Sequence, residues 1–157
     1  MGQDVDLAFA LSAADSDSKP IIQPSEVSVW DTEYCAPSKI FSAFREGLCA
    51  GFMPWTPELR HEREFNARIE SVSLKRGVIS RIKTTPHTTS RTARDVANSD
   101  SPCIYAAFLL GGSICLEQDG TSAAANQGDL ALFTSEKPIF VTEDPKHNHQ
   151  ALVLMIP

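Results

Sequence analysis

The sequence predicts a mainly β protein in which short antiparallel strands close into a small barrel or sandwich. Cys103–Thr134 contains four short strand patterns in succession, with no room for crossover helices between them. Asp119-Gly120 is a strong hairpin signal, because a type I′ turn needs positive φ at both central positions. Turn residues recur evenly along the second half of the chain without an internal repeat, which favours a jelly-roll-like closed structure over a propeller or a solenoid.

Individual strands follow from the alternation of apolar and polar residues. Cys103–Leu110 is apolar on both alternating faces, which is typical of a strand packed on both sides. His87–Thr92 is polar and β-branched and follows Pro86, so we expect it at a sheet edge. The other expected strands are Ala67–Leu74, Val78–Thr84, Ser113–Gln118, Thr121–Asn126, Leu130–Thr134, Ile139–Thr142 and Gln150–Ile156.

One helix is expected, over Ser38–Phe52, with its apolar face packed on the outside of the sheet. Five apolar residues recur there at spacings of three and four: Ile40, Phe41, Phe44, Leu48 and Phe52. Trp30 and Trp55 flank this helix and would anchor it as large apolar residues. Residues 1–29 mix small, acidic and proline residues without lasting periodicity, which predicts a flexible N-terminal arm before a single domain over residues 30–157.

Composition limits the function classes. The formal net charge is -6, with 20 acidic and 14 basic residues, which disfavours direct binding to nucleic acid, because that affinity depends on neutralising phosphates. The four cysteines have no metal-ligand spacing and are interpreted as buried free thiols of a reducing compartment. No secretion signal and no long apolar run is present, so we expect a cytoplasmic protein without membrane contact.

Several segments occur in a recognisable order. They are FNARIESVSLKRGVISRIKTTPHTTSRT, the apolar strand that ends at Gly111-Gly112, the turn Gln118-Asp119-Gly120, the step Gly128-Asp129-Leu130, the pair Lys137-Pro138 and the closing ALVLMIP. Together, residues 65–157 resemble the cupin-like N-terminal ligand-binding domain of the AraC family of bacterial transcription regulators, in its AraC-binding-like subgroup.

The resemblance implies a cupin-like double-stranded β-helix, or jelly-roll barrel, with one N-terminal helix packed outside. It also implies that a small organic effector binds inside the barrel, that the protein forms a homodimer, and that DNA is contacted only through a C-terminal helix-turn-helix domain beyond Pro157. The expected function is therefore effector sensing and dimerisation in a transcription regulator. We expect the dimer interface on the Ser38–Phe52 helix or on a helix that follows Pro157.

Cupin-type folds also host metal enzymes, which usually offer two histidines one residue apart, a nearby carboxylate and a third histidine on a later strand. The hairpin in which the first two histidines would fall has Ser113, Cys115 and Glu117 instead. The sequence therefore predicts no metal site and no cofactor.

The four histidines are interpreted as structural or surface residues. His147 and His149 form an HxH pair just after Asp144-Pro145, where a surface turn is expected, so both are predicted at the surface. His61 lies in a charged loop and His87 follows a proline.

No nucleophile elbow, zinc-protease motif, P-loop or dinucleotide fingerprint is present, so binding is expected rather than catalysis. The candidate ligand-binding residues are Arg81 and Lys83, which share a strand face and could meet an anionic ligand, and the aromatic residues Tyr105, Phe108, Phe133 and Trp55. The same residues would also fit ordinary roles at the surface and in the core. Acidic, aromatic and sugar-like ligands all remain open.

Two alternative functions stay open. The first is a cupin-fold metal-dependent enzyme, such as an isomerase or a dioxygenase. The second is a carbohydrate-binding or partner-binding β-sandwich without a regulatory role.

Overall fold

The computed structural model describes residues 26–51, 54–59, 65–99 and 101–157. Most of the arm predicted over residues 1–29 lies outside this part, although its last residues, Ser28 and Val29, already belong to the first strand. Within the described part, no helix is long and apolar enough to cross a membrane.

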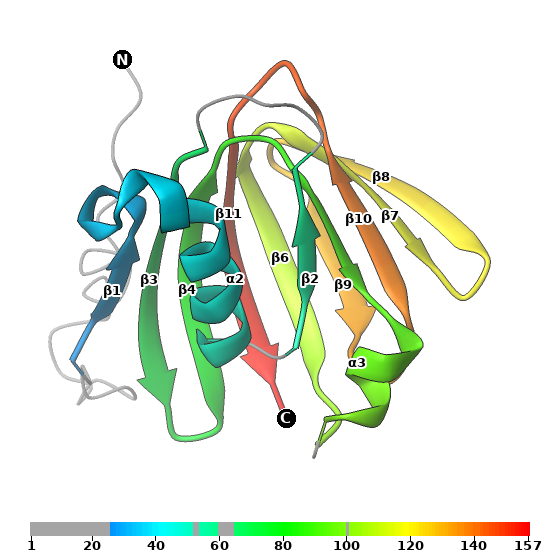
Figure 1. The fold of residues 1–157 in the computed structure, drawn as a ribbon. Coiled ribbons are helices and arrows are strands. Elements are labelled where there is room, and N and C mark those ends of the chain that lie inside the picture. Colours follow the sequence, from blue (N-terminus) through cyan, green and yellow to red (C-terminus); the bar gives the residue numbers. More distant parts are fainter. Residues whose placement is uncertain (1–25, 52–53, 60–64, 100) are drawn as a thin grey trace, which may run out of the picture.

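Two antiparallel sheets face each other (Figure 1). The first has six strands in the order β1 (Ser28–Asp31), β3 (Ala67–Leu74), β4 (Gly77–Thr84), β11 (His149–Ile156), β6 (Ile104–Gly111) and β9 (Leu130–Thr134). The second has five strands in the order β2 (Thr56–Glu58), β5 (Thr88–Arg91), β10 (Ile139–Glu143), β7 (Ser113–Gln118) and β8 (Thr121–Asn126). The prediction of a mainly β jelly roll is confirmed.

The nine predicted strands are all present, most with bounds within one residue of those expected. The hairpin between β7 and β8 turns at Asp119 and Gly120, which both have positive φ, as a type I′ turn requires. Three short elements were not predicted: β1, β2 and the helix α3 (Ala93–Ala97). Elements of three to five residues are too short to show a period, although α3 does begin with a capping box between Thr92 and Asp95.

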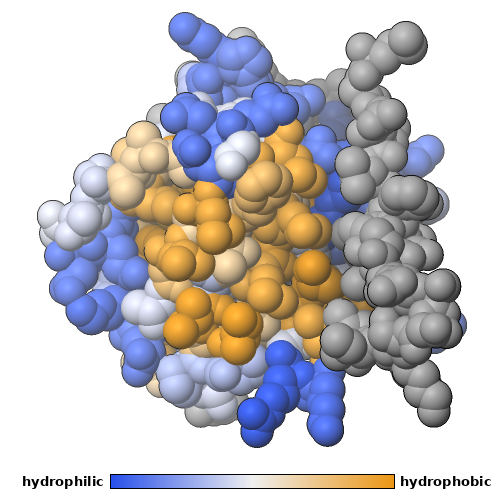
Figure 2. Space-filling model, turned by 180° about the vertical axis from the view of Figure 1, so that it is seen from behind, coloured by the Kyte–Doolittle hydropathy of each residue, from blue (hydrophilic) through white to orange (hydrophobic). Residues whose placement is uncertain are grey.

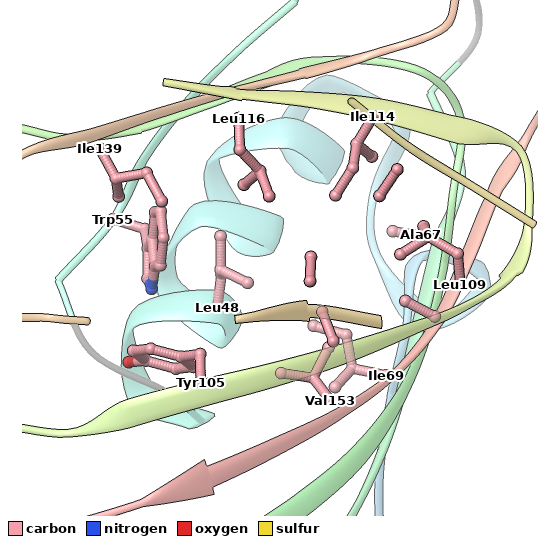
Figure 3. Close-up of a cluster of buried hydrophobic side chains, with 14 of the residues drawn as sticks. Leu48, Trp55, Ala67, Ile69, Tyr105, Leu109, Ile114, Leu116, Ile139 and Val153 are labelled. Carbon is pink, nitrogen blue, oxygen red and sulfur yellow. The ribbon is translucent and has the colours of Figure 1, made fainter. Parts of the chain in front are cut away.

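The main helix, α2 (Ile40–Gly51), follows the short 3₁₀ turns Thr32–Tyr34 and Pro37–Lys39. Its position differs from the expected one. Phe44 and Leu48 are buried in the same cluster as the inward-facing strand residues, so the helix closes one side of the space between the sheets instead of lying on an outer face (Figures 1 and 3). The 4.8 Å separation between the ring centroids of Phe44 and Phe65 shows how closely it packs.

The core lies between the two sheets (Figure 3). The first sheet contributes Ile69, Tyr105, Leu109 and Val153, and the second contributes Ile114, Leu116 and Ile139. All four cysteines are free thiols; Cys103 is buried, whereas Cys35, Cys49 and Cys115 are only partly buried.

The prediction that Cys103–Leu110 is packed on both sides is wrong. Tyr105, Ala107 and Leu109 of β6 are buried, but Ile104 and Phe108, on the opposite face, are 56% and 40% exposed. On the neighbouring strand β9, Leu130 and Leu132 are 58% and 66% exposed. These four side chains form the outer apolar patch, and Figure 2, which shows the molecule from behind, has a broad apolar area on that side.

The turn between β3 and β4 depends on Gly77. This residue has a φ of 120°, and a Cβ atom there would collide with the carbonyl oxygen of Met155 in β11. Gly120 also has a positive φ, of 73°, but a Cβ atom there would meet open space. We expect Gly77→Ala to lower the free energy of unfolding by about 3 kcal/mol, and Gly120→Ala by about 1 kcal/mol. Urea denaturation measures both, and equal losses would contradict the close approach at Gly77.

Candidate functional site

A cavity of about 100 Å³ lies inside the barrel, between α2 and the two sheets. Four aromatic residues from different elements form much of its wall: Phe44, Trp55, Tyr105 and Phe133. Four polar residues gather around it as well: Thr84, His87, Glu143 and His149. The remaining lining residues are aliphatic except for Thr89. A mainly apolar lining with a few convergent polar groups is typical of small-molecule sites.

A larger hollow, of about 600 Å³, adjoins this cavity at Thr84 and His149 and is also lined by residues such as Asp31, Arg68, Lys83 and Asn148. Charged residues are paired along it: Arg68 donates to Asp31 at 2.9 Å and to Glu70 at 2.8 Å. The interior cavity is the better candidate site, because it combines apolar walls with buried polar groups.

The aromatic wall has a fixed arrangement. Tyr105 of β6 and Phe133 of β9 stack with their ring centroids 5.0 Å apart and an interplanar angle of 13°. Trp55 meets both rings edge-on, with centroid separations of 6.0 Å to Tyr105 and 6.2 Å to Phe133. Figure 3 shows Trp55 and Tyr105 side by side at one end of the core cluster. Such stacked and edge-to-face contacts are the preferred geometries of aromatic pairs.

Three of the predicted site residues line the cavity and three do not. Trp55, Tyr105 and Phe133 line it. Phe108 points out of the barrel, since it alternates with the buried residues of β6. Arg81 and Lys83 lie on the outer face of β4, since Ser80, Ile82 and Thr84 take the inner face.

Trp55 is positioned by residues from three parts of the chain. Its backbone N–H donates to the Sγ atom of Cys49 in α2 at 3.4 Å. The buried guanidinium of Arg91 donates from Nη1 to the carbonyl of the preceding residue, Pro54, at 2.8 Å and from Nε to the carbonyl of Ser135 at 3.0 Å. Arg91 therefore ties the segment that carries Trp55 to β5 and to the turn after β9, which keeps this aromatic wall in place.

Glu143 provides a buried carboxylate at the polar end of the cavity. It accepts hydrogen bonds from the backbone N–H of His87 at 3.2 Å and from the Thr84 hydroxyl at 3.3 Å. The Nδ1 atom of His87 lies 3.1 Å from the same carboxylate. The sequence analysis missed Glu143, because a single acidic residue at the end of a strand gives no motif.

The prediction of His149 at the surface is wrong. Strand β11 begins one residue earlier than expected, and the alternation that buries Ala151 and Val153 also turns His149 inward. Its side chain is 11% exposed, whereas that of His147 is 68% exposed, as predicted for a surface residue. His149 Nε2 lies 3.9 Å from Glu143, and Nδ1 has no hydrogen-bond partner in the described part of the chain.

The hydroxyl of Tyr105 is the second unpartnered polar group at the cavity. Tyr105 is only 1% exposed, and its oxygen has no partner of ordinary hydrogen-bond geometry among the described residues. Burial raises the pKa of Tyr105 to about 12, despite the opposing influence of the nearby Trp55 N–H. The phenol therefore stays neutral, and leaving its hydroxyl unsatisfied costs on the order of 1–3 kcal/mol.

The positions in β7 that were compared with the metal-binding histidines of cupin enzymes do not face the interior. Ser113, Cys115 and Glu117 alternate with the buried residues Ile114 and Leu116, so they lie on the outer face of β7. The interior instead brings His87, Glu143 and His149 together. Among the described residues, no group of three or more histidine, cysteine, aspartate or glutamate side chains has the arrangement of a metal site.

The lowered pKa of His149 predicts that the stability of the folded protein depends on pH. Burial lowers this pKa, against the raising influence of Glu143. Below the ordinary histidine pKa of 6.5, the unfolded chain therefore binds more protons than the folded protein. The stability that neutral His149 contributes is complete above this pH and is lost as the pH falls below it. We expect the urea midpoint to decrease from about pH 7 to about pH 5, and His149→Gln to weaken this decrease.

The matched control is His147→Gln. His147 lies 3.1 Å from Asp144 in an ion pair, but it is 68% exposed and exposed pairs contribute little to stability, so this variant should stay close to the wild-type pH dependence. Identical pH profiles for His149→Gln and wild type would contradict the role assigned to His149.

The family model for the AraC-binding-like domain matches residues 44–157. Among solved structures, the AraC-like transcriptional activator CuxR has a TM-score of 0.73 at 14% sequence identity, over 84% of this chain and 47% of that one. The chain thus spans about half the length of that activator.

Two further structures are similar over a smaller part of the chain. The EutQ protein of Clostridium difficile has a TM-score of 0.46 at 12% identity, over 61% of this chain and 71% of that one. A cupin superfamily protein of Desulfitobacterium hafniense has a TM-score of 0.43 at 12% identity, over 63% of this chain and 82% of that one. No curated protein matches this sequence. Because the family match covers well over half of the chain, this protein belongs to the AraC-binding-like domain family and has a cupin-like fold.

Proposed function

We propose that this domain senses a small organic effector for an AraC-type transcription regulator, with the interior cavity as the binding site. The observation that carries the proposal is a cavity of about 100 Å³ that has aromatic walls and two buried polar groups, Tyr105 Oη and His149 Nδ1, for which the described residues offer no hydrogen-bond partner. Unsatisfied buried polar groups are costly in a folded protein. A ligand that enters the cavity and hydrogen-bonds to them recovers this cost, which supports binding as the function.

The regulator context comes from the family. Membership in the AraC-binding-like family supports a regulatory domain whose effector changes DNA binding by a separate helix-turn-helix domain. The net charge of -6 in this chain is consistent with DNA contact through another domain. The domain would then work by population shift, in which the effector favours one of two states through its higher affinity for that state.

A homodimer is part of the same proposal. The α2 helix is a poor candidate for its interface, because Phe44 and Leu48 are used in the core. The outer apolar patch on β6 and β9 is a better candidate, since its four large side chains are exposed and adjacent on one sheet face. Burying apolar surface of this kind against a second copy of itself is favourable, and a twofold dimer needs such a self-complementary patch.

Filling the cavity tests the binding site. Val153 of β11 lines the cavity, and its neighbour Leu152 points to the opposite face. A thermal-shift screen of small organic compounds against the wild type should find ligands that raise the melting temperature. We expect Val153→Phe to remove this rise, since the added ring occupies the cavity, at a stability cost of about 1–3 kcal/mol. Leu152→Phe is the matched control and should retain the rise. Retention of full binding by Val153→Phe would refute the cavity as the effector site.

A charge in the outer apolar patch tests the dimer. Leu132 is the most exposed member of the patch, so Leu132→Glu should leave the fold intact and shift the protein from dimer to monomer in sedimentation equilibrium. Val29→Glu is the control, because Val29 is 45% exposed on β1, at the other end of the same sheet. A wild-type protein that remains monomeric at high concentration would contradict this interface.

A further inference from the structure

We propose that the effector is a small, planar, single-ring molecule that is neutral or positively charged, and that the cavity rejects organic anions. This inference rests on the proposed function, in that it takes the cavity as the effector site, and it names the ligand class that the site selects. It differs from the sequence-based expectation that Arg81 and Lys83 could meet an anionic ligand.

The size of the cavity limits the ligand. A dry apolar cavity of about 150 Å³ accepts benzene. The cavity of this protein, at about 100 Å³, is smaller than that, so a single ring is the most it can hold and wall side chains must move to admit it; sugars with several rings and long acyl chains are excluded.

The wall favours a flat ligand. Phe133, Tyr105 and Trp55 surround one side of the cavity with stacked and perpendicular rings. A planar ring can stack on them or meet them edge-on, and either contact contributes about 0.5–1.5 kcal/mol beyond the burial of its area. Aromatic faces also attract cations, and this attraction strengthens when water is excluded.

The charge at the polar end selects against anions. The Oε1 atom of Glu143 lies 3.4 Å from the Thr84 hydroxyl and 3.9 Å from His149 Nε2, so its contacts are long and it can accept a further hydrogen bond. A ligand N–H or O–H can supply this bond. A ligand carboxylate would instead bring a second negative charge beside a buried one, which is strongly unfavourable in a low-dielectric interior.

The other charged and polar residues near the cavity do not remove this preference against anions. The side chains of Arg81 and Lys83 lie on the outer face of β4 and are not among the residues that line the cavity. His149 lines the cavity, but burial lowers its pKa and favours its neutral form. The Tyr105 hydroxyl is neutral and can either donate to the ligand or accept from it. His87 lies against the same carboxylate, and its Nδ1 atom is 3.1 Å from Glu143 and 3.2 Å from the carbonyl oxygen of Thr85, so both of these contacts are with the protein.

Isosteric compounds of different charge provide the test. Benzamidine, benzamide and benzoate share one shape and carry charges of about +1, 0 and −1 near neutral pH, and acetamidine, acetamide and acetate form the corresponding smaller series. We expect the amidine and the amide of at least one series to raise the melting temperature and to bind at least about tenfold more tightly than the carboxylate in isothermal titration calorimetry.

Two variants test whether Glu143 causes this order of affinities. Glu143→Gln removes the buried charge and should bring the ratio of amidine to carboxylate affinity close to one. Glu117→Gln makes the same change in net charge on the exposed face of β7 and should keep the wild-type ratio. If Glu143→Gln does not fold, the order in which the wild-type protein binds the amidine, the amide and the carboxylate still decides the inference.

The outcomes separate this inference from the proposed function. Tightest binding by benzoate or acetate, or no binding by any of the six compounds, overturns the ligand class. The proposed function does not fall with that result, because it depends on whether other ligands lose affinity in Val153→Phe and keep it in Leu152→Phe. An anion that binds the wild type tightly and is lost in Val153→Phe would confirm the site and refute the class.

Discussion

The buried carboxylate of Glu143 is the constraint on which both the fold and the site depend. A carboxylate in the interior needs hydrogen-bond donors, and it obtains them from the Thr84 hydroxyl, at the end of β4, and from the backbone N–H of His87. The N–H of Glu143 donates in return to the carbonyl of His87 at 3.2 Å. Because β4 belongs to one sheet and Glu143 to the other, these bonds fix the point at which the chain crosses between the sheets.

The same crossing sets the position of α2. The ring of His87 meets Phe44 of α2 edge-to-face, with centroids 5.2 Å apart, and meets Phe65 at 5.7 Å. The helix therefore packs on residues that the Glu143 bonds hold in place, and Phe44 and Leu48 become both core and cavity wall. Stability and the proposed effector binding thus involve the same residues, so any variant at Glu143 or His87 must be compared with the wild type for folding before its binding is interpreted.

The sequence was sufficient for the nine longer strands and for three aromatic residues of the cavity wall, but not for the polar end of the site. Alternation and turn residues located β3, β6 and β7 nearly to the residue, since a strand has a period of two that the sequence displays directly. Where both faces of a strand are apolar, the sequence does not show which face points inward. Phe108 was therefore predicted to contact the ligand, although it lies on the outer face of β6. His149 was predicted in a surface turn because the expected strand began at Gln150. Strand β11 begins one residue earlier, and this places the His149 side chain in an inward-facing position. Glu143 and His87 come together only through the crossing between sheets, which no local pattern encodes.

Strand β9 connects the two surfaces to which function is assigned here. Phe133 points into the cavity and stacks on Tyr105, while its neighbour Leu132 points outward and is the most exposed residue of the outer apolar patch. Consecutive residues of a strand move together, because the backbone that joins them is held by hydrogen bonds to β6. An effector that displaces the Phe133 ring would therefore shift the surface at which a second copy is proposed to bind. Such a shift changes dimer affinity only if the effector binds one arrangement of β9 more tightly than the other, and the coupling is then reciprocal: the dimer would raise effector affinity by the same factor.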